Sequence, residues 1–580
     1  MSKVLTTSQY IYLVHFYDDK GRMIQAQTSN YTGAIDTLTT QYDFTGKPLR
    51  TLLNHKKGWN TAQNHIILTK FSYDASSRLK STFKNIDGTG DVLIDSLQYN
   101  EWGKVQTKYL GNAMDSISYD YNIRGWLTGI NKQYVGGGTN HYFGLELGYD
   151  NPISVTGSTY VSQFNGNLAG MTWKTKGDST KRKYDFTYDN LNRLTGANFT
   201  QNTGLGGWNN SLVNYTVSNI TYDANGGLQS MFQQGFKWNG SSLIDSLTYG
   251  YYGNTNKLYQ VKDGDNDSLS QLGDFHYKGI QADTAYRYDG NGNLVKDYNK
   301  GIDTIIYNYL NMPQQIHVIG KGSIIYTYDA AGGKLSKVTM DSLSKHATSV
   351  LYVGSFVYQQ RDTISNPTGG VDTLQFIAHE EGRFRWAQHY YQNGSTAFGW
   401  ENDLFERDHL GNTRVILTTQ KDTAYYAATM EGAYRSKENA LFYNIPQTAY
   451  SRTLAGYPVD LSMTNPNDSV IMLNGTAGRT QGPAIILKVM AGDTVNIGAK
   501  AYYTSLTGTG TTPSITDVLT SLASGIVSVT AGSKGTAGQL NTTTSPLYGA
   551  LNTFITNKDG TISNKPRAYL NWMFLDDQYQ

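Results

Sequence analysis

The sequence predicts an all-β fold in which β-hairpins follow one another along the chain as a strip. Two observations lead to this prediction. The string Tyr-Asp-x-x-Gly recurs along residues 1–340, and short runs of alternating polar and apolar residues precede it. Alternation with a period of two is the pattern of a strand with one buried face. Because internal repeats decide the architecture of a chain, this recurrence indicates a repetitive β structure that covers or encloses something.

Each copy of the string has the residues of a hairpin corner. The Asp carboxylate can accept hydrogen bonds from backbone N–H groups just ahead of it, and the Gly supplies a positive φ. The complete copies are Tyr42, Asp43 and Gly46; Tyr222, Asp223 and Gly226; Tyr288, Asp289 and Gly292; and Tyr328, Asp329 and Gly332. Degenerate copies are predicted at Tyr73, Tyr99, Tyr119 and Tyr188, and worn copies around Tyr149 and Tyr249.

Strand-like runs connect these corners. Examples are 95–99, 115–119, 245–249 and 303–307, and an apolar residue such as Leu228 or Leu294 begins each return strand. The copies are irregularly spaced. A solenoid with a fixed coil length tolerates such scatter poorly, whereas a strip of hairpins can place additional residues in its edge loops. We therefore expect a continuous antiparallel strip.

Composition narrows the class of function. Tyr supplies 45 residues against 19 Phe and 9 Trp, which suits a sheet with one face toward a polar or hydrated interior. The net charge is +2 and no Lys/Arg run stands out, so no nucleic-acid partner is predicted. No apolar run approaches the roughly 20 residues of a membrane span, and residues 1–17 lack a signal-peptide pattern. The absence of Cys excludes disulfides and cysteine-based zinc sites.

The chain is predicted to contain three zones. Residues 1–340 form the repeat zone, 341–429 carry different strand motifs, and 430–580 form a β-sandwich-like domain with helical insertions. In the third zone we expect a hairpin over 484–503, helices near 514–522 and 547–555, and a core strand over 568–575. Because that strand has no cap after it and the chain begins inside strand-like sequence, we expect a piece of a longer protein, truncated in its third zone.

A longer motif lies in the second zone. Asp408, His409, Gly411 and Arg414 belong to the string Arg-Asp-His-Leu-Gly-Asn-Thr-Arg-Val, and Glu-Gly-Arg at 381–383 precedes it. Together with the Tyr-Asp repeats, this string resembles the repeat-associated core of the Rhs family over the first two zones. The third zone resembles, more loosely, the β-rich insertion of Bacteroidetes members.

The resemblance implies a hollow shell that holds a C-terminal toxin or other cargo in cis, in a protein that is secreted or displayed at the cell surface. Many members end in an aspartyl self-cleavage segment of the D-P-x-G kind. No such segment occurs in this sequence, so neither self-cleavage nor a toxin domain is assigned to the chain.

The motif residues also allow a chemical interpretation. Asp408 and His409 with Arg414 could form an acid–base group. However, the spacing from Asp408 to Gly411 repeats that of the hairpin corners, so we interpret the motif as another corner in which Arg414 pairs with Asp408. His379 and His389 do not have the spacing that places two metal ligands on one helix face, and we predict no metal site there.

One acidic segment matches part of a calcium loop. Asp263, Asp265, Asp267 and Asp274 offer alternating oxygen donors. Ser268 stands where such a loop has Gly, and Asp274 stands where it has a bidentate Glu. A solvated loop tip is therefore the favoured interpretation, calcium is the alternative, and no other cofactor is predicted.

Three functions remain open at this stage. The first is a non-enzymatic shell or scaffold, and the second is an adhesin that binds cell-surface glycans through Tyr and Trp, with 430–580 as a carbohydrate-binding module. The third is a hydrolase with paired carboxylates. No nucleophile elbow, phosphate loop or dinucleotide fingerprint is present, and backbone capping accounts for the repeated Asp residues. We therefore predict a structural protein that is not an enzyme.

Overall fold

The computed structural model describes most of residues 1–421 and a smaller part of the chain beyond them. The described residues after 421 are 426–458, 468–474, 479, 481–487, 489, 493, 495–502, 570 and 572. Gaps before 421 cover 59–62, 151–159, 205–206, 238–239, 254, 266–272, 278–283, 366–371 and 391–395. The chain divides into two compact units, Met1–Thr423 and Ala424–Gln580. The zone boundaries at 340 and 429 remain predictions.

The first unit confirms the prediction of an all-β fold. After the short pair β1 (Ser2–Lys3) and β2 (Tyr10–Ile11), strands β3 to β21 pair antiparallel with their neighbours along the chain, with β16 pairing both β17 and β18. One short helix, α1 (Lys132–Gly136), follows β12. The strands are β3 (Leu13–Tyr17), β4 (Met23–Ser29), β5 (Ile35–Tyr42), β6 (Pro48–His55), β7 (His65–Tyr73), β8 (Leu79–Ile86), β9 (Val92–Tyr99), β10 (Val105–Leu110), β11 (Asp115–Tyr121), β12 (Leu127–Ile130), β13 (Phe143–Gly148), β14 (Gly170–Thr175), β15 (Lys181–Tyr188), β16 (Leu194–Asn202), β17 (Trp208–Asn209), β18 (Val217–Tyr222), β19 (Leu228–Lys237), β20 (Gly240–Tyr251) and β21 (Leu258–Asp263).

A second sheet of 12 strands continues the same pattern in chain order. Its strands are β22 (Tyr286–Tyr288), β23 (Leu294–Asp297), β24 (Ile302–Tyr307), β25 (Pro313–Val318), β26 (Gly322–Tyr328), β27 (Lys334–Asp341), β28 (His346–Val353), β29 (Phe356–Thr363), β30 (Thr373–His379), β31 (Gly382–Tyr390), β32 (Thr396–Arg407) and β33 (Thr413–Thr418). Because every connection is a hairpin, this part of the chain needs no crossover.

A break in register lies immediately before many of the corner tyrosines. Tyr42 pairs with Pro48, and the register shifts between Gln41 and Tyr42; the Tyr73 and Tyr222 corners have the same irregularity. A β-bulge increases the local twist and bends its strand. Repeating it at corner after corner adds to the natural twist of the sheet, so the strip curves continuously.

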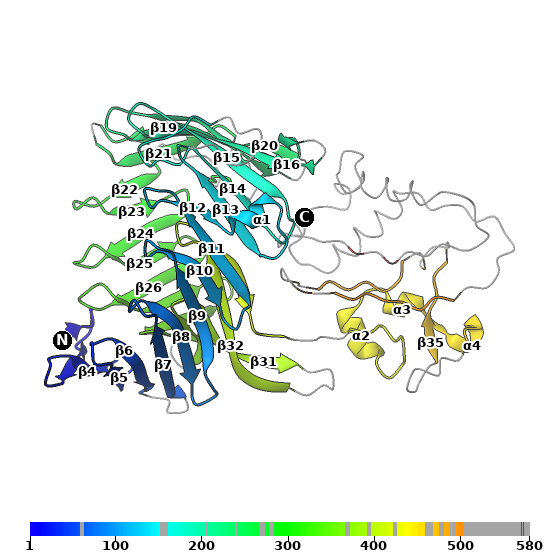
Figure 1. Ribbon diagram of the computed structural model, residues 1–580. Helices are drawn as coiled ribbons and strands as arrows, with labels where there is room; N and C mark the ends of the chain where they lie inside the picture. Colours follow the sequence, from blue (N-terminus) through cyan, green and yellow to red (C-terminus); the bar gives the residue numbers. More distant parts are fainter. Residues whose placement is uncertain are drawn as a thin grey trace. The chain divides into compact units, whose positions relative to one another are not determined.

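The curved strip returns upon itself. Ile67, Ile86 and Ile94 of β7–β9 share one buried cluster with residues of β28–β31, among them Phe356 and Tyr358. Figure 1 shows the early strands β7–β9, in blue, beside the late strand β32, in yellow-green. A second cluster joins strands β10–β13 to β32 and β33 through buried residues that are less than 10% exposed: Leu110, Ile117, Ile130, Phe143, Leu145, Leu147, Leu404 and Leu417. In each cluster, strands nearly 300 positions apart in the chain share an apolar core, whose burial stabilises the return.

The first residues of the chain are also held by a later hairpin. Val4 and Leu5 are 0% and 4% exposed. The Leu5 N–H donates to the carbonyl of Tyr328 at 2.8 Å, and Val4 forms a β-bridge with Asp329. One of the predicted corners thus packs against the N-terminal segment.

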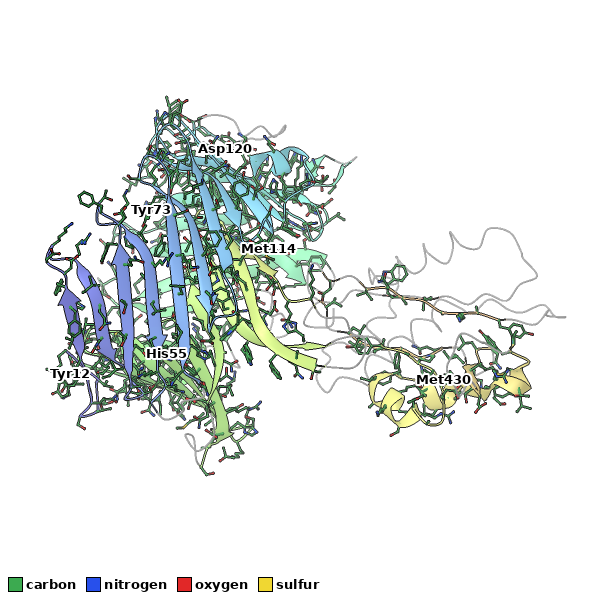
Figure 2. The ribbon with its side chains drawn as sticks, turned by 60° about the horizontal axis from the view of Figure 1, so that its bottom comes forward. Tyr12, His55, Tyr73, Met114, Asp120 and Met430 are labelled. Carbon is green, nitrogen blue, oxygen red and sulfur yellow. The ribbon has the colours of Figure 1, made fainter. Side chains whose placement is uncertain are left out.

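The two ends of the strands have different surroundings. Figure 2 shows Tyr73 and His55 at opposite ends of the early strands. Tyr73 lies at a corner between β7 and β8, whereas His55 ends β6 and lies against the second sheet. The His55 ring stacks on Phe356 with 3.8 Å between ring centroids. The corners therefore form one edge of the strip, and the opposite edge contributes to its closure.

The second unit contains short elements in its described residues. They are α2 (Arg435–Leu441), α3 (Ile445–Thr448), β34 (Ala449–Ser451), α4 (Arg452–Ala455) and β35 (Ser469–Ile471). None of the helices among the described residues combines the length and the apolar character needed to cross a bilayer.

The described residues cover only part of the third-zone predictions. Residues 484–487 and 495–502 form no strand beyond a bridge between Ala484 and Tyr443, because no neighbouring strand offers them a ladder of hydrogen bonds in the described part. Leu570 and Trp572, expected in a core strand, are 50% and 69% exposed. The helices predicted at 514–522 and 547–555 lie outside the described residues, and the β-sandwich remains a prediction.

Candidate functional site

The Asp of each complete repeat caps its own corner. Oδ1 of Asp223 accepts hydrogen bonds from the backbone N–H groups of Asn225 at 2.9 Å and Gly227 at 2.7 Å. Gly226 closes the turn with a φ of 85°, which only Gly adopts without strain. Asp43, Asp289 and Asp329 accept the corresponding bonds, and Gly46, Gly292 and Gly332 have φ values of 88° to 91°.

At two of these corners the bonds favour the ionised form of the carboxylate. The backbone N–H of Lys47 lowers the pKa of Asp43, and the Thr45 hydroxyl adds to the effect. At Asp289, the Asn293 side-chain amide is the main cause of a lowered pKa. A carboxylate with a depressed pKa that is already occupied by backbone donors is a poor general acid. Capping therefore explains these residues better than catalysis does.

At most corners the Tyr ties its hairpin to the preceding one. Its hydroxyl donates to the backbone carbonyl of a residue at or near the start of a return strand in that preceding hairpin. Ten bonds of this kind measure 2.7–3.1 Å: Tyr42 to Met23, Tyr73 to Pro48, Tyr99 to Leu79, Tyr121 to Val105, Tyr149 to Leu127, Tyr188 to Leu168, Tyr222 to Leu194, Tyr251 to Leu228, Tyr307 to Leu294 and Tyr328 to Pro313. We call this series the tyrosine ladder.

Basic residues reinforce several steps of the tyrosine ladder. Arg78 donates from Nε to Asp74 at 2.7 Å, and its guanidinium lies 4.5 Å from the centre of the Tyr99 ring. Arg193 repeats this arrangement between Asp189 and Tyr222. One side chain therefore links the Asp of its own corner to the Tyr of the next, through an ion pair and a cation–π contact.

Two predicted corners lie two residues later than expected. β11 ends at Tyr121, so Tyr121 rather than Tyr119 occupies the corner position. Asn122 takes the place of Asp, and Gly125 has the required φ of 76°. Likewise, β20 ends at Tyr251, so the corner predicted around Tyr249 lies at Tyr251. The period of two places either Tyr on the same face. In the first of these corners only Tyr121 stands four residues before a Gly with positive φ.

The corner of Asp408 has the same geometry and an additional ion pair. Oδ1 of Asp408 accepts from the N–H groups of Leu410 and Asn412, each at 2.9 Å, and Gly411 has a φ of 84°. Arg414 on β33 approaches Oδ2 at 2.6 Å. Burial acts to raise the pKa of Asp408, but bonds from Asn412 and Arg414 outweigh it and lower the pKa overall. Asp408 therefore serves the corner.

His409 does not complete an acid–base pair. Its Nδ1 is buried and has no hydrogen-bond partner among the described residues. Burial lowers the pKa of the ring, which keeps it neutral. Asp408 uses both of its oxygens on the corner and on Arg414. Because no bond joins Asp408 to His409, the arrangement supports the corner interpretation.

The Glu-Gly-Arg element fits closely against β32. A Cβ on Gly382 would lie 1.9 Å from the carbonyl oxygen of Asp403, so only glycine fits between these strands. Arg383 and Arg385 contact the buried Asp403 carboxylate at 2.9 and 2.6 Å. Burial acts to raise the pKa of Asp403, and the bonds from the two guanidinium groups lower it overall. The element therefore fixes two strands at close distance.

Buried polar pairs join the second sheet to the early strands. Lys57 pairs with Asp372, and their side chains are 0% and 8% exposed. His55 Nε2 lies 2.8 Å from the hydroxyl of Tyr358. Lys108 of β10 contacts Glu381 at 2.8 Å. We call these contacts the seam. Because buried charges are costly unless paired, the seam specifies which strands meet.

Two buried carboxyl groups lie close together between β32 and β11. Glu406 of β32 and Asp115 of β11 are 1% and 6% exposed, and no donor reaches the Glu406 oxygens among the described residues. Burial, followed by the neighbouring Asp115 carboxyl, raises the pKa of Glu406 well above its usual range. A carboxyl group that is buried beside another carboxyl favours its protonated form, and this applies to Glu406.

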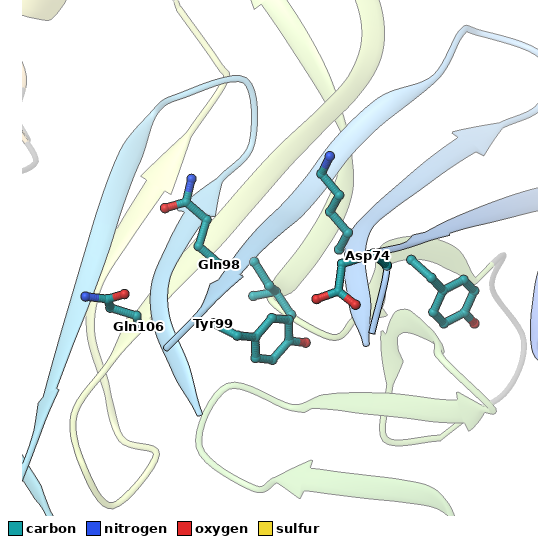
Figure 3. Close-up of a pocket in the computed structure, with 8 residues that line it drawn as sticks. Asp74, Gln98, Tyr99 and Gln106 are labelled. Carbon is teal, nitrogen blue, oxygen red and sulfur yellow. The ribbon is translucent and has the colours of Figure 1, made fainter. Parts of the chain in front are cut away.

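An open pocket of about 540 Å³ lies between two neighbouring corners. Its lining includes Tyr73, Asp74, Leu97, Gln98 and Tyr99. Figure 3 shows the Asp74 carboxylate near the Tyr99 ring, with Gln98 beyond it. Tyr73 and Tyr99 both belong to the tyrosine ladder and Asp74 to a corner. The repeat itself therefore creates this hollow.

The two histidines considered for metal binding have separate partners. His379 Nε2 lies 2.9 Å from Oδ1 of Asn402, and burial lowers its pKa to about 4. His389 Nε2 lies 3.0 Å from Glu401. The structure does not bring the two rings to one site.

The calcium candidates separate into two groups. Asp263 and Asp274 lie in a buried group with Asp245 of β20, and their ligand atoms are within 4.8 Å of one another. Asp265 instead points to Lys237, with 3.3 Å between the charged atoms. Asp267 lies outside the described residues. Sequence reasoning missed Asp245, because it belongs to a strand run that is distant in sequence.

No family model and no curated protein matches the chain. Among solved structures it is similar to a chain of the crystal structure of TcdB2-TccC3-Cdc42, with 13% identity, a TM-score of 0.39 and coverage of 69% of this chain and 19% of that one. It is also similar to TcdB2-TccC3 without its hypervariable C-terminal region, with 12% identity, a TM-score of 0.23 and coverage of 70% and 25%.

A third similar structure is the Photorhabdus luminescens Tc holotoxin pore with the mutation TccC3-D651A, with 12% identity, a TM-score of 0.20 and coverage of 71% and 27%. The chain thus spans about a fifth to a quarter of the length of these proteins. Every TM-score is below 0.5, so the residues and contacts of the chain itself carry the functional conclusion.

Proposed function

We propose that this chain is a non-enzymatic shell or scaffold of the Rhs type. In this proposal the hairpin strip encloses or presents a cargo, such as a toxin domain, joined on its C-terminal side in a longer secreted or surface-displayed protein. The observation that carries the proposal is the seam. A strip that curves and is then locked to its own beginning by buried pairs is suited to enclosing a volume.

The tyrosine ladder supports this role. A shell must resist opening between any two of its hairpins, because one gap exposes the contents. Ten tyrosine bonds at 2.7–3.1 Å link successive hairpins along the described part of the strip. Each bond is worth only about 1 kcal/mol, but repetition distributes the stability along the whole strip.

The state of the carboxylates favours a structural role over hydrolysis. A glycosidase needs one protonated and one ionised carboxyl group beside an open substrate site. The corner aspartates are bonded to backbone N–H groups, and Asp403 is bonded to two arginines. The raised pKa of Glu406 favours its protonated form, but its side chain is only 1% exposed, which leaves it no access to a sugar.

Protease protection tests the shell function. The native protein would be isolated from its producing organism, its intact mass measured, and its digestion followed by mass spectrometry. The shell proposal expects a mass above 64.3 kDa and a C-terminal segment that resists protease until the shell is unfolded. A cargo segment digested as fast in the native protein as on its own would contradict the proposal, and so would a mass of 64.3 kDa.

An exposed aromatic group supports a second candidate, a glycan-binding adhesin. Trp386 and Phe398 on β31 and β32 are 49% and 57% exposed and lie 6.3 Å apart at an interplanar angle of 14°. Trp400 packs edge-on against Trp386 at 5.1 Å. Flat exposed rings of this kind can stack on sugars. A glycan array probed with the chain and with Trp386→Ala tests this function, and equal blank arrays would contradict it.

A further inference from the structure

Three carboxylates are buried together where β20 and β21 meet the segment 273–277. Asp245 lies on β20, Asp263 ends β21, and Asp274 follows in the chain. Asp245 and Asp263 are 2% and 6% exposed, and the Asp274 side chain is 0% exposed. One oxygen from each residue lies within 4.8 Å of the others.

Backbone donors satisfy only part of this group. Oδ1 of Asp245 accepts from the N–H of Phe275 at 2.7 Å. Oδ1 of Asp263 accepts from the N–H groups of Ser246 at 2.9 Å and Asp265 at 3.0 Å. These bonds orient the two carboxylates through Oδ1 and do not involve Oδ2 of either residue.

Asp274 provides the independent evidence for a ligand. Both of its carboxylate oxygens are buried without a hydrogen-bond partner among the described residues, and so is Oδ2 of Asp263. A fully buried polar side chain without a partner is costly, and a charged one far more so. Asp274 points at the other two carboxylates, where it increases the concentration of negative charge.

The basic groups nearby do not balance this charge. Nδ1 of His276 lies 3.7 Å from Oδ2 of Asp274, which is longer than a hydrogen bond. Lys237 is paired with Asp265 at 3.3 Å, outside the group. Burial raises the pKa of Asp274 to about 6, with His276 opposing the shift, and burial also raises the pKa of Asp245. The group is thus built for a cation that none of the described side chains supplies.

We propose that Asp245, Asp263 and Asp274 bind one divalent cation of the calcium type. Oxygen ligands of Ca²⁺ lie about 2.3–2.6 Å from the ion, so two of them are at most about 5 Å apart. The observed limit of 4.8 Å between ligand atoms meets this condition. Carboxylates are the hard oxygen ligands that Ca²⁺ prefers.

The proposed ion would have a structural effect. Two ligands belong to the hairpin of β20 and β21, and the third belongs to the segment after it. An ion shared by them would attach that segment to the strip where the first sheet ends. The site differs from the calcium loop predicted from sequence, because Asp245 replaces Asp265 and Asp267 as a ligand.

Isothermal titration of CaCl₂ into the metal-free full chain tests the proposal. We expect one ion per chain, with at least tenfold weaker binding for Asp245→Asn and for Asp274→Asn. Asp265→Asn is the matched control and should bind as the wild type does. No binding by the wild type up to about 10 mM Ca²⁺, well above the weakest protein calcium sites, would overturn the proposal. Equal loss in Asp265→Asn would overturn the ligand set.

Thermal unfolding of the wild-type chain gives a second readout that does not depend on the variants being folded. A ligand that binds only the folded state raises Tm as its concentration increases. We expect a higher Tm in CaCl₂ than in EDTA, with a smaller effect of MgCl₂. Equal Tm values in CaCl₂ and EDTA, or stabilisation by ZnCl₂ alone, would contradict a calcium-type site.

Discussion

Removing the hydrogen bond from Tyr99 to Leu79 tests directly how neighbouring hairpins are held together. The Tyr99 hydroxyl donates to the Leu79 carbonyl at 2.7 Å. Tyr99→Phe removes this donor and keeps the ring on which Arg78 stacks. Loss of one such bond costs about 1 kcal/mol, which corresponds to roughly a fivefold increase in local opening. The effect should be confined to β8, β9 and their neighbours, because each hairpin contacts mainly the next.

Hydrogen–deuterium exchange read by mass spectrometry measures this opening. Peptides covering 79–99 should exchange roughly five times faster in Tyr99→Phe, while peptides of β26 and β27 should not change. Tyr309→Phe is the matched control, because Tyr309 is 73% exposed and lies outside the tyrosine ladder. Unchanged exchange over 79–99 would refute the reasoning, and so would an equal change in Tyr309→Phe.

Arg78 gives the complementary measurement on the same step. Arg78→Gln removes the guanidinium 4.5 Å from the Tyr99 ring and its ion pair with Asp74. At this partly exposed position each contact is worth about 0.5–1 kcal/mol or less. Exchange over 79–99 should therefore increase in Arg78→Gln, and more in the double variant with Tyr99→Phe than in either single one. No increase in Arg78→Gln would show that the stacked guanidinium contributes nothing.

Three further predictions concern the seam and its surroundings. Gly382→Ala should prevent close pairing of β31 and β32 and lower the free energy of unfolding by more than about 3 kcal/mol, because the added Cβ would lie 1.9 Å from a carbonyl oxygen. Gly290→Ala is the control: Gly290 has open space around it, so this variant should leave the urea midpoint of unfolding unchanged. Asp372→Asn should cost about 3–5 kcal/mol by removing the charged partner of the buried Lys57 ammonium, and adding Lys57→Met should recover part of that loss in the same assay. Folding raises the pKa of Glu406 above its unfolded value of 4.5, so the free energy of unfolding should fall as pH rises above that value, by up to about 1.4 kcal/mol per pH unit. Glu406→Gln should flatten this slope. An unchanged slope in the variant would contradict the raised pKa of Glu406.

The corners could be predicted from sequence because their chemistry is local. An Asp that accepts from the N–H groups two and four residues ahead, followed by Gly at positive φ, is complete within a few residues. Asp223 and Gly226 show this directly. The same locality caused the error at Tyr119, where two tyrosines share one strand face and only Gly125 distinguishes them.

The contacts between distant strands could not be predicted in the same way. Nothing near Lys57 in the sequence indicates Asp372 as its partner, and nothing near Asp274 indicates Asp245. These pairs depend on the accumulated twist and bulges of many hairpins, each of which changes the direction of the strip slightly. A single sequence shows the residue pattern of each hairpin. It does not show how the small changes of direction at successive hairpins add up along the strip.

The central proposal is that the hairpin strip, whose late strands contact its early ones, bounds an interior. Electron cryo-microscopy of the full chain tests this claim most directly, since it images the strip and the space within it. The account predicts a map in which strands β3 to β33 surround a region without protein density, with the seam closing the strip at Lys57 and Asp372. A map in which the strip is open at the seam, or in which side chains fill the interior completely, would contradict it.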